Sequence, residues 1–189
     1  MFMLHRPRDK TIRELLARAR DQSFTFPFAD FQNEAFPHGF NVDHNRTKLG
    51  AGPAAFSRGI EAIKRWEMFN IGWVELCWPD APIENGSVVA VLASHLGFYS
   101  LNACRIVNVI DEDRPVRRYG FIYGTLPEHA ELGEERFTVE WHREDDSVWY
   151  DILAYSRPNQ LLSKVGYPIA RLLQKRFAND SMAAMIHSV

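Results

Sequence analysis

The chain has 189 residues, of which 46% are hydrophobic and 13% aromatic, and its formal net charge at pH 7 is −2. This length and composition fit one globular domain with a substantial core. The charge argues against a basic surface for nucleic acid or anionic membranes. The opening MFMLHRPRDK lacks the apolar run of a signal peptide, and no later stretch is apolar enough to span a membrane. We therefore expect a soluble cytoplasmic protein that has no integral membrane segment and binds no nucleic acid.

The two cysteines, Cys77 and Cys104, are too few for a disulfide framework. Each lies in a strand-like run, where a buried free thiol is the expected state and a redox pair the alternative.

The N-terminal part predicts a short helix and then a phenylalanine-rich arm. Residues 9–20 repeat apolar side chains at helical spacing. The following FTFPFADFQNEAFPHGF is too apolar for a linker and too interrupted by proline for a helix. We expect residues 1–38 to pack on the domain and cover part of its sheet, with most phenylalanines between Phe24 and Phe36 buried. A partner-binding surface is the alternative.

The remainder, residues 39–189, is expected to form a single domain of strands and two helices. Pro53 is well placed to begin a helix that continues to Trp66, and the longest helical pattern runs from Asn159 to about His187, with a kink near Gly166–Pro168. The expected apolar stripe of this last helix consists of Leu162, Val165, Ile169, Leu172 and Phe177. The strand-like segments are 41–49, 73–78, 87–95, 103–111, 119–125, 135–141 and 148–156. Residues 87–95 are apolar on both faces, so both must be covered.

Successive strands joined by short turns imply an antiparallel meander. We predict an α+β fold in which a curved seven-stranded antiparallel sheet grips the long C-terminal helix, with a short helix after the first strand and the N-terminal arm added. This arrangement can leave a cavity between the helix and the sheet.

Three runs carry a resemblance to a known family: NACRIVNVID, YGFIYGTLPEHAELGEERFTVE and AYSRPNQLLSKVGYPIARLLQKRFANDSMAAM. They resemble domain-of-unknown-function family 1990, found in bacteria and plants, within the START-related, birch-pollen-allergen-like helix-grip superfamily. The resemblance implies a helix-grip fold and lends no catalytic residues. It also implies a cavity for apolar or amphipathic molecules such as lipids, sterols or polyketides, a function that rests on fold analogy.

The hairpin from Tyr119 to Trp141 supplies the candidate site. We expect the loop Pro127–Gly133 to join two strands that pair Thr125 with Glu135 and Tyr123 with Phe137. A tight turn at Asp145–Asp146 would then set the next strand. The predicted pairs across it are Trp141 with Tyr150, Val139 with Ile152, Phe137 with Ala154 and Glu135 with Ser156.

On the other side of the hairpin, pairing Val107 with Phe121 would place Arg105 opposite Tyr123 on the same face. A slip of one residue would turn Arg105 outward and Ile106 inward, and the sequence leaves both registers open. The expected ligand-binding residues are Arg105, Phe121, Tyr123, Thr125, Glu135, Phe137, Val139, Ile152 and Ser156. The structural alternative is an ion pair between Glu135 and Arg105 that only stabilises the fold.

The loop PEHAELGEE carries Glu128, His129, Glu131 and Glu134, but their spacing matches no compact metal motif, so we expect a solvated loop, no metal and no cofactor. No residue is predicted to be catalytic. The leading hypothesis is a hydrophobic or amphipathic small molecule, lipid-like or polyketide-like, bound between sheet and helix. The alternatives are an enzyme of the lyase, cyclase or hydrolase type that uses Glu135 or Tyr123 in the same cavity, and a protein-interaction module.

Overall fold

The computed structural model describes residues 1–95, 97–159 and 167–189. Its helices are α1 (Asp9–Ala19), α2 (Gly52–Lys64), the short 3-10 helix η1 (Glu67–Phe69) and α4 (Tyr167–Ser188). Its strands are β1 (Phe2–Met3), β2 (Asn41–Ala51), β3 (Val74–Cys77), β4 (Val88–His95), β5 (Phe98–Asp113), β6 (Val116–Thr125), β7 (Glu131–His142) and β8 (Ser147–Pro158). The predicted order of elements is confirmed, and β1 is an addition that the sequence did not indicate.

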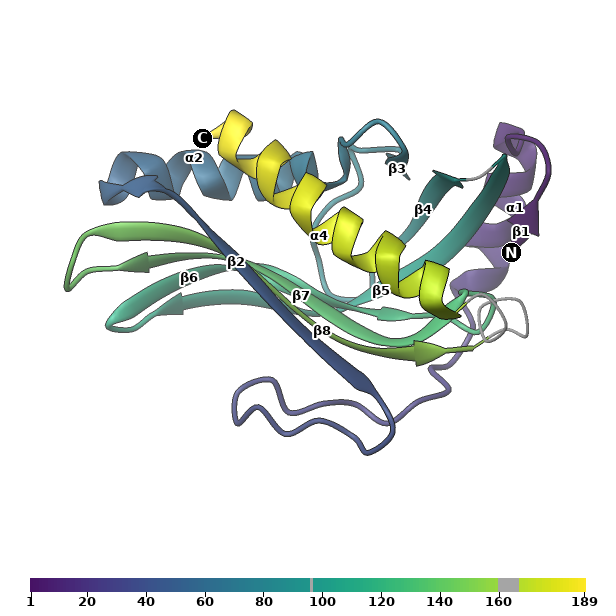
Figure 1. The fold of residues 1–189 in the computed structure, drawn as a ribbon, viewed down its shortest axis with the longest axis horizontal. Coiled ribbons are helices and arrows are strands. Elements are labelled where there is room, and N and C mark those ends of the chain that lie inside the picture. Colours follow the sequence, from purple (N-terminus) through teal and green to yellow (C-terminus); the bar gives the residue numbers. More distant parts are fainter. Residues whose placement is uncertain (96, 160–166) are drawn as a thin grey trace.

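Seven strands form one antiparallel sheet in the order β2-β8-β7-β6-β5-β4-β3, and β1 pairs with the start of β5. The sheet curls, and Figure 1 shows α2 and α4 lying on its concave side while the arm after α1 runs along the opposite side. This is the helix-grip architecture predicted above.

Both faces of β4 are covered, as its apolar sequence requires. Val89 and Val91 face the main core under the helices, whereas Ala90 and Leu92 pack against α1 on the other side. The α1 face that meets them carries Leu15, which is 1% exposed. The helix predicted for residues 9–20 therefore covers the outer side of the sheet.

The phenylalanine-rich arm covers the convex face farther along the sheet. Phe26 and Phe31 are buried against Ile122, Leu153 and Tyr155 of the strands. Of the other phenylalanines in the predicted range, Phe24 and Phe36 are half-buried and Phe28 is 54% exposed. The prediction that most of these phenylalanines are buried was therefore correct for Phe26 and Phe31 and wrong for the other three.

Helix α4 differs from its predicted form. The expected kink at Gly166 lies outside the described residues, as do Leu162 and Val165 of the expected stripe, and Pro168 stands at the start of the described helix. Leu172 is 67% exposed, so the stripe was wrong there. The buried positions are Ala178, Ser181 and Met185, one and two turns apart on a different face. Apolar residues occur on more than one side of this helix, so periodicity alone could not identify the packed face.

The register of the central hairpin is shifted by two residues from the predicted one. Tyr123 pairs with Glu135, and Phe121 pairs with Phe137. An even shift keeps every side chain on its predicted face. The connection between the strands, residues 126–130, is shorter than expected because β7 already begins at Glu131.

The pairing of β7 with β8 is shifted by two residues as well, so that Glu135 lies opposite Ala154 and Gly133 opposite Ser156. The turn is longer than the two-residue turn predicted, since His142 pairs with Ser147. Asp146 in this turn has a φ of 61°, and its carboxylate accepts a hydrogen bond from Trp141 Nε1. The residue types of this turn therefore did not indicate the left-handed conformation at Asp146.

Candidate functional site

A cavity of about 900 Å³ lies between the sheet and α4. Most of its lining is apolar, and the aromatic side chains Phe69, Trp73, Phe98 and Phe177 contribute to it. Leu4, Phe98 and Ile169 line the cavity and are also between 47% and 67% exposed, so it opens to solvent between the start of β5 and the start of α4. The volume is within the range of pockets that take drug-sized ligands.

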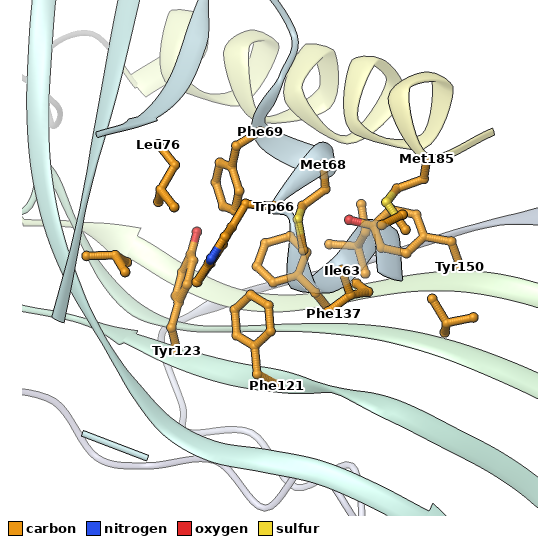
Figure 2. Close-up of a cluster of buried hydrophobic side chains, with 14 of the residues drawn as sticks. Ile63, Trp66, Met68, Phe69, Leu76, Phe121, Tyr123, Phe137, Tyr150 and Met185 are labelled. Carbon is orange, nitrogen blue, oxygen red and sulfur yellow. The ribbon is translucent and has the colours of Figure 1, made fainter. Parts of the chain in front are cut away.

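The other half of the concave face is filled by an aromatic plug, which we define as Trp66, Met68 and Phe69 of the segment after α2. Figure 2 shows this segment between α4 and the side chains of the sheet, with Trp66 beside Phe121. The ring centroids of these two residues are 4.8 Å apart. Trp66 has a φ of 57°, in the left-handed region, and this conformation ends α2 and turns the chain onto the sheet.

Three of the residues predicted to bind the ligand lie under the aromatic plug and α2 and are packed core instead. Phe121, Phe137 and Val139 are 0% exposed. They belong to the cluster that also contains Tyr150 and Met185 and are not among the residues that line the cavity. The prediction placed them on the correct face but could not foresee that the segment after α2 covers Phe121 and Phe137 and that α2 covers Val139.

Four of the remaining predicted residues, Tyr123, Thr125, Glu135 and Ser156, lie in two rows at the polar end of the cavity, and Ile152, opposite Phe137, also lines the cavity. Tyr123, Glu135 and Ala154 are neighbours across β6, β7 and β8. In the next row Gly133 lies between Thr125 and Ser156, and its backbone N–H donates a 3.0 Å hydrogen bond to Thr125 Oγ1. Thr125, Glu135 and Ser156 therefore share one face, but the predicted single row of these three was wrong.

Gly133, in the middle of the second row, lies unusually close to the backbone of β8. Its φ is +147°, and a Cβ atom built on it would lie 1.9 Å from the carbonyl oxygen of Tyr155. Only glycine fits at this point of β7. Thr125 and Ser156, on either side of Gly133, both line the cavity.

Glu135 is the central polar group of the cavity. The Tyr123 hydroxyl donates a 2.9 Å hydrogen bond to Glu135 Oε2. Burial raises the pKa of Glu135 to about 7, although this hydrogen bond favours the carboxylate, and Glu131 and Asp43 nearby raise the pKa further. Near neutral pH this carboxyl group is therefore present in both its protonated and its ionised form.

Glu131 lies on the same face of β7, one row beyond Gly133. Gln174 of α4 donates through Nε2 to Glu131 Oε2, at 2.5 Å, and to Ser156 Oγ, at 3.1 Å. Burial raises the pKa of Glu131, against the effect of these partners. The expectation of a solvated loop in this stretch was wrong for Glu131. Alternation from Phe137 back through Glu135 would have placed Glu131 inward if β7 had been extended.

An ion pair fastens α4 to the edge strand beside this site. Arg171 donates through Nη1 and Nη2 to the two carboxylate oxygens of Asp43 on β2, with the Nη2 distance 2.6 Å. Arg171 Nη1 also donates to Gln174 Oε1 at 2.6 Å, which orients the amide toward Glu131. These contacts link residues far apart in sequence, so no local pattern could reveal them.

Arg105 does not join the site. A β-bulge at Val107 in β5 shifts the pairing, so that Arg105 lies opposite Gly124 and Ile106 opposite Tyr123. Arg105 therefore points to the outer face, where its guanidinium donates to the carbonyl oxygens of Ala19, at 2.8 Å, and Arg20, at 2.9 Å. The inward orientation was wrong, and the alternative register is the correct one.

The stretch PEHAELGEE, which was expected to be a solvated loop, is more buried than predicted. Burial lowers the pKa of His129 to about 3, so its imidazole is neutral. Glu134 is 5% exposed and belongs to the outer face, where Oε2 accepts a 3.0 Å hydrogen bond from the backbone N–H of Ala29. Within residues 1–95, 97–159 and 167–189 no three histidine, cysteine, aspartate or glutamate side chains are grouped so that they could hold a metal ion.

The comparison with protein families identifies the chain. The model of the family described as "Domain of unknown function (DUF1990)" matches residues 25–184. The chain belongs to this family. It is 32% identical to a UPF0548 protein of Dictyostelium discoideum, covering 100% of this chain and 96% of the relative. It is 30% identical to a UPF0548 protein of Deinococcus radiodurans, covering 100% of this chain and 98% of that relative.

Solved structures with a related course of the backbone have low sequence identity to this DUF1990 member. A hypothetical protein of Helicobacter pylori is 14% identical, with a TM-score of 0.49 over 86% of this chain and 98% of the other. The structure of Ara h 8.0201 is 13% identical, with a TM-score of 0.45 over 79% of this chain and 99% of the other. In the part of the chain that the structure describes, no helix is long and apolar enough to cross a membrane.

Proposed function

We propose that this DUF1990 member binds an amphipathic small molecule in the cavity between the sheet and α4. The observation that carries the proposal is the unequal filling of the concave face: the aromatic plug fills one half, while about 900 Å³ stays open in the other. Protein cores are normally packed without large voids, and an unfilled apolar volume lowers stability. A ligand that fills the cavity would recover this stability.

The apolar and polar residues of the lining lie in different parts of the cavity, and this separation sets the expected orientation of the ligand. The apolar part lies along α4 and β4, where Leu173, Phe177 and Val91 line the cavity. The polar part is gathered around Glu135 and Glu131 on β7. An apolar pocket with a few convergent polar groups is typical of small-molecule sites. The tail of a lipid-like or polyketide-like ligand would lie beside α4, and its head group would reach β7.

Native mass spectrometry of the purified protein tests the proposal directly, because a co-purified molecule would appear as an added mass that is lost on denaturation. Binding of a polarity-sensitive fluorescent probe provides a second measurement. Ala154 lies in the cavity beside Glu135, so Ala154→Phe should reduce probe affinity about tenfold or more while the protein stays folded. Ala54→Phe on the exposed face of α2 is the matched control and should leave affinity unchanged. Probe binding that Ala154→Phe does not alter would contradict the proposal.

An enzyme is the second candidate, and the Glu135–Tyr123 pair favours it. A general base is most effective when its pKa is close to the working pH, and burial raises that of Glu135 to about 7. The test is incubation with a ligand identified by mass spectrometry. Glu135→Gln should then abolish any change in the ligand's mass while the ligand still binds. An unchanged ligand mass with the wild-type protein would leave binding as the function.

A further inference from the structure

The polar end of the cavity has an excess of carboxyl groups. Glu131 and Glu135 both line it and are both half-buried. Glu135 accepts one hydrogen bond, through Oε2, and among the described residues no donor contacts Oε1. A carboxyl oxygen that faces an open cavity without a donor leaves a place for a hydrogen-bond donor from a ligand.

The cationic groups around the cavity do not balance these carboxyls. Arg171 gives both of its terminal nitrogens to Asp43. Burial lowers the pKa of His129 to about 3 and also lowers that of His95, so both imidazoles are neutral near pH 7. Lys175 lines the cavity but is exposed to solvent. His44 also lines it, and its Nε2 lies 2.6 Å from Asp151 Oδ2. The Met1 ammonium, near His129, donates to the carbonyl oxygens of Leu101 and Glu128. The interior of the cavity is therefore acidic whenever Glu131 or Glu135 ionises.

We infer that the ligand is an amphiphilic amine, whose ammonium group is held by Glu135 and Glu131 while its apolar part lies along α4. This inference deepens the proposed function and rests on it. An ammonium carries up to three donors and no acceptor, so it suits a pair of carboxyls that lack a cation. Charge-assisted hydrogen bonds of this kind are stronger than those between neutral groups.

Other head groups fit the same surroundings less well. A carboxylate head would meet two carboxyls, and ionised groups of like charge repel one another strongly where water is excluded. The guanidinium that could offset this repulsion, Arg171, is already paired with Asp43. A hydroxyl head would donate one hydrogen bond to Glu135 but would gain no ion pair. The expected order of affinity is therefore amine, alcohol, fatty acid.

Binding of an amine should release protons. The titratable or charged groups around Glu135 are Tyr123 of β6, Cys104 of β5, Tyr150 of β8, Glu131 of β7 and Asp43 of β2, with Arg171 of α4 beyond Glu131. Burial raises the pKa values of Tyr123, Tyr150 and Cys104, so these groups keep their protons near pH 7. An ammonium beside Glu135 lowers the pKa of this carboxyl and of Glu131. Protons taken up near pH 6 to 7 in the empty protein are then lost to the buffer.

The experiment compares dodecylamine, dodecanol and dodecanoate, which share one chain length and differ in the head group, below their critical micelle concentrations. Isothermal titration calorimetry near pH 6.5, in buffers of different ionisation enthalpy, gives both the affinity and the number of protons released. We expect dodecylamine to bind about tenfold more tightly than dodecanol and to release a fraction of one proton. Dodecanoate should bind most weakly.

Two variants distinguish the effect of the Glu135 carboxyl group from a general effect of removing a carboxyl group from the protein. Glu135→Gln should reduce the preference for dodecylamine over dodecanol to about threefold or less and remove most of the proton release. Glu144→Gln is the matched control, because it removes one carboxyl group from the exposed β7–β8 turn and Glu144 is not among the residues that line the cavity. It should keep the preference and the proton release.

Three results would overturn the inference. Equal binding of amine and alcohol would show that the head group is not held by charge, and tightest binding of dodecanoate would assign the head group to Arg171 or Lys175. Both results leave the proposed function standing. Failure of all three compounds to bind would remove the proposed function together with the inference.

Discussion

Replacing Glu135 by glutamine tests the electrostatics of the cavity in the ligand-free protein. Glutamine has nearly the same shape, and its side-chain carbonyl still accepts the hydrogen bond from Tyr123. The substitution removes only the ionisable group. It should therefore change how the free energy of unfolding depends on pH, with little change in packing.

The size of the effect follows from the pKa difference between the folded and unfolded chain. Burial raises the pKa of Glu135 from 4.5 to about 7. A difference of roughly 2.5 pKa units at 1.36 kcal/mol each corresponds to about 3 kcal/mol. Because the folded state binds this proton more tightly than the unfolded chain, the contribution is fully present below about pH 4.5. It is lost as pH rises toward 7 and is constant above that.

Urea unfolding followed by tryptophan fluorescence at several pH values between 5 and 8 measures this difference. Near pH 5 the two proteins should differ by less than about 1 kcal/mol, and at pH 8 the variant should be more stable by up to about 3 kcal/mol. Glu134, whose pKa burial also raises, is present in both proteins, so its effect cancels in the comparison. Glu144→Gln in the exposed β7–β8 turn is the control and should change the free energy of unfolding by less than about 0.5 kcal/mol. A Glu135→Gln variant that is less stable than wild type at pH 8 would refute the reasoning.

Four further substitutions test the fold around the cavity. Phe26→Ala should lower the free energy of unfolding by about 3 kcal/mol because a buried ring is lost, whereas Phe28→Ala, at 54% exposed, should change it by less than about 0.5 kcal/mol. Thermal melts compare the two, and equal losses would contradict the packing of the arm. Gly133→Ala should disrupt the β7–β8 pairing, because its Cβ would lie 1.9 Å from the Tyr155 carbonyl oxygen, and a native circular dichroism spectrum would show this reasoning to be wrong. Trp66→Ala should cost about 3–5 kcal/mol and enlarge the cavity, so that bulkier fluorescent probes bind; unchanged probe selectivity would argue against the aromatic plug as the boundary of the site.

Side-chain alternation determined which face of the sheet most site residues occupy. Tyr123, Glu135 and Ile152 remain on the inner face in any register that is shifted by an even number of residues. This is why the inward position of Glu135 could be predicted although the predicted partners of β7 were displaced by two residues on both sides. Alternation could not place Arg105, because the bulge at Val107 reverses the alternation in β5 and no residue type there indicates a bulge.

The sequence by itself thus determined the order of elements, the antiparallel meander and the apolar inner face. Only the tertiary structure decided which part of that face is core and which part is cavity. Phe121 and Tyr123 are neighbours in the same alternating pattern, yet the aromatic plug seals the first and leaves the second beside open space. Core and cavity linings both consist of apolar inward side chains, so hydrophobic periodicity is the same for the two. The distinction arises from distant segments, the turn at Trp66 and the path of α4, whose positions no local pattern encodes.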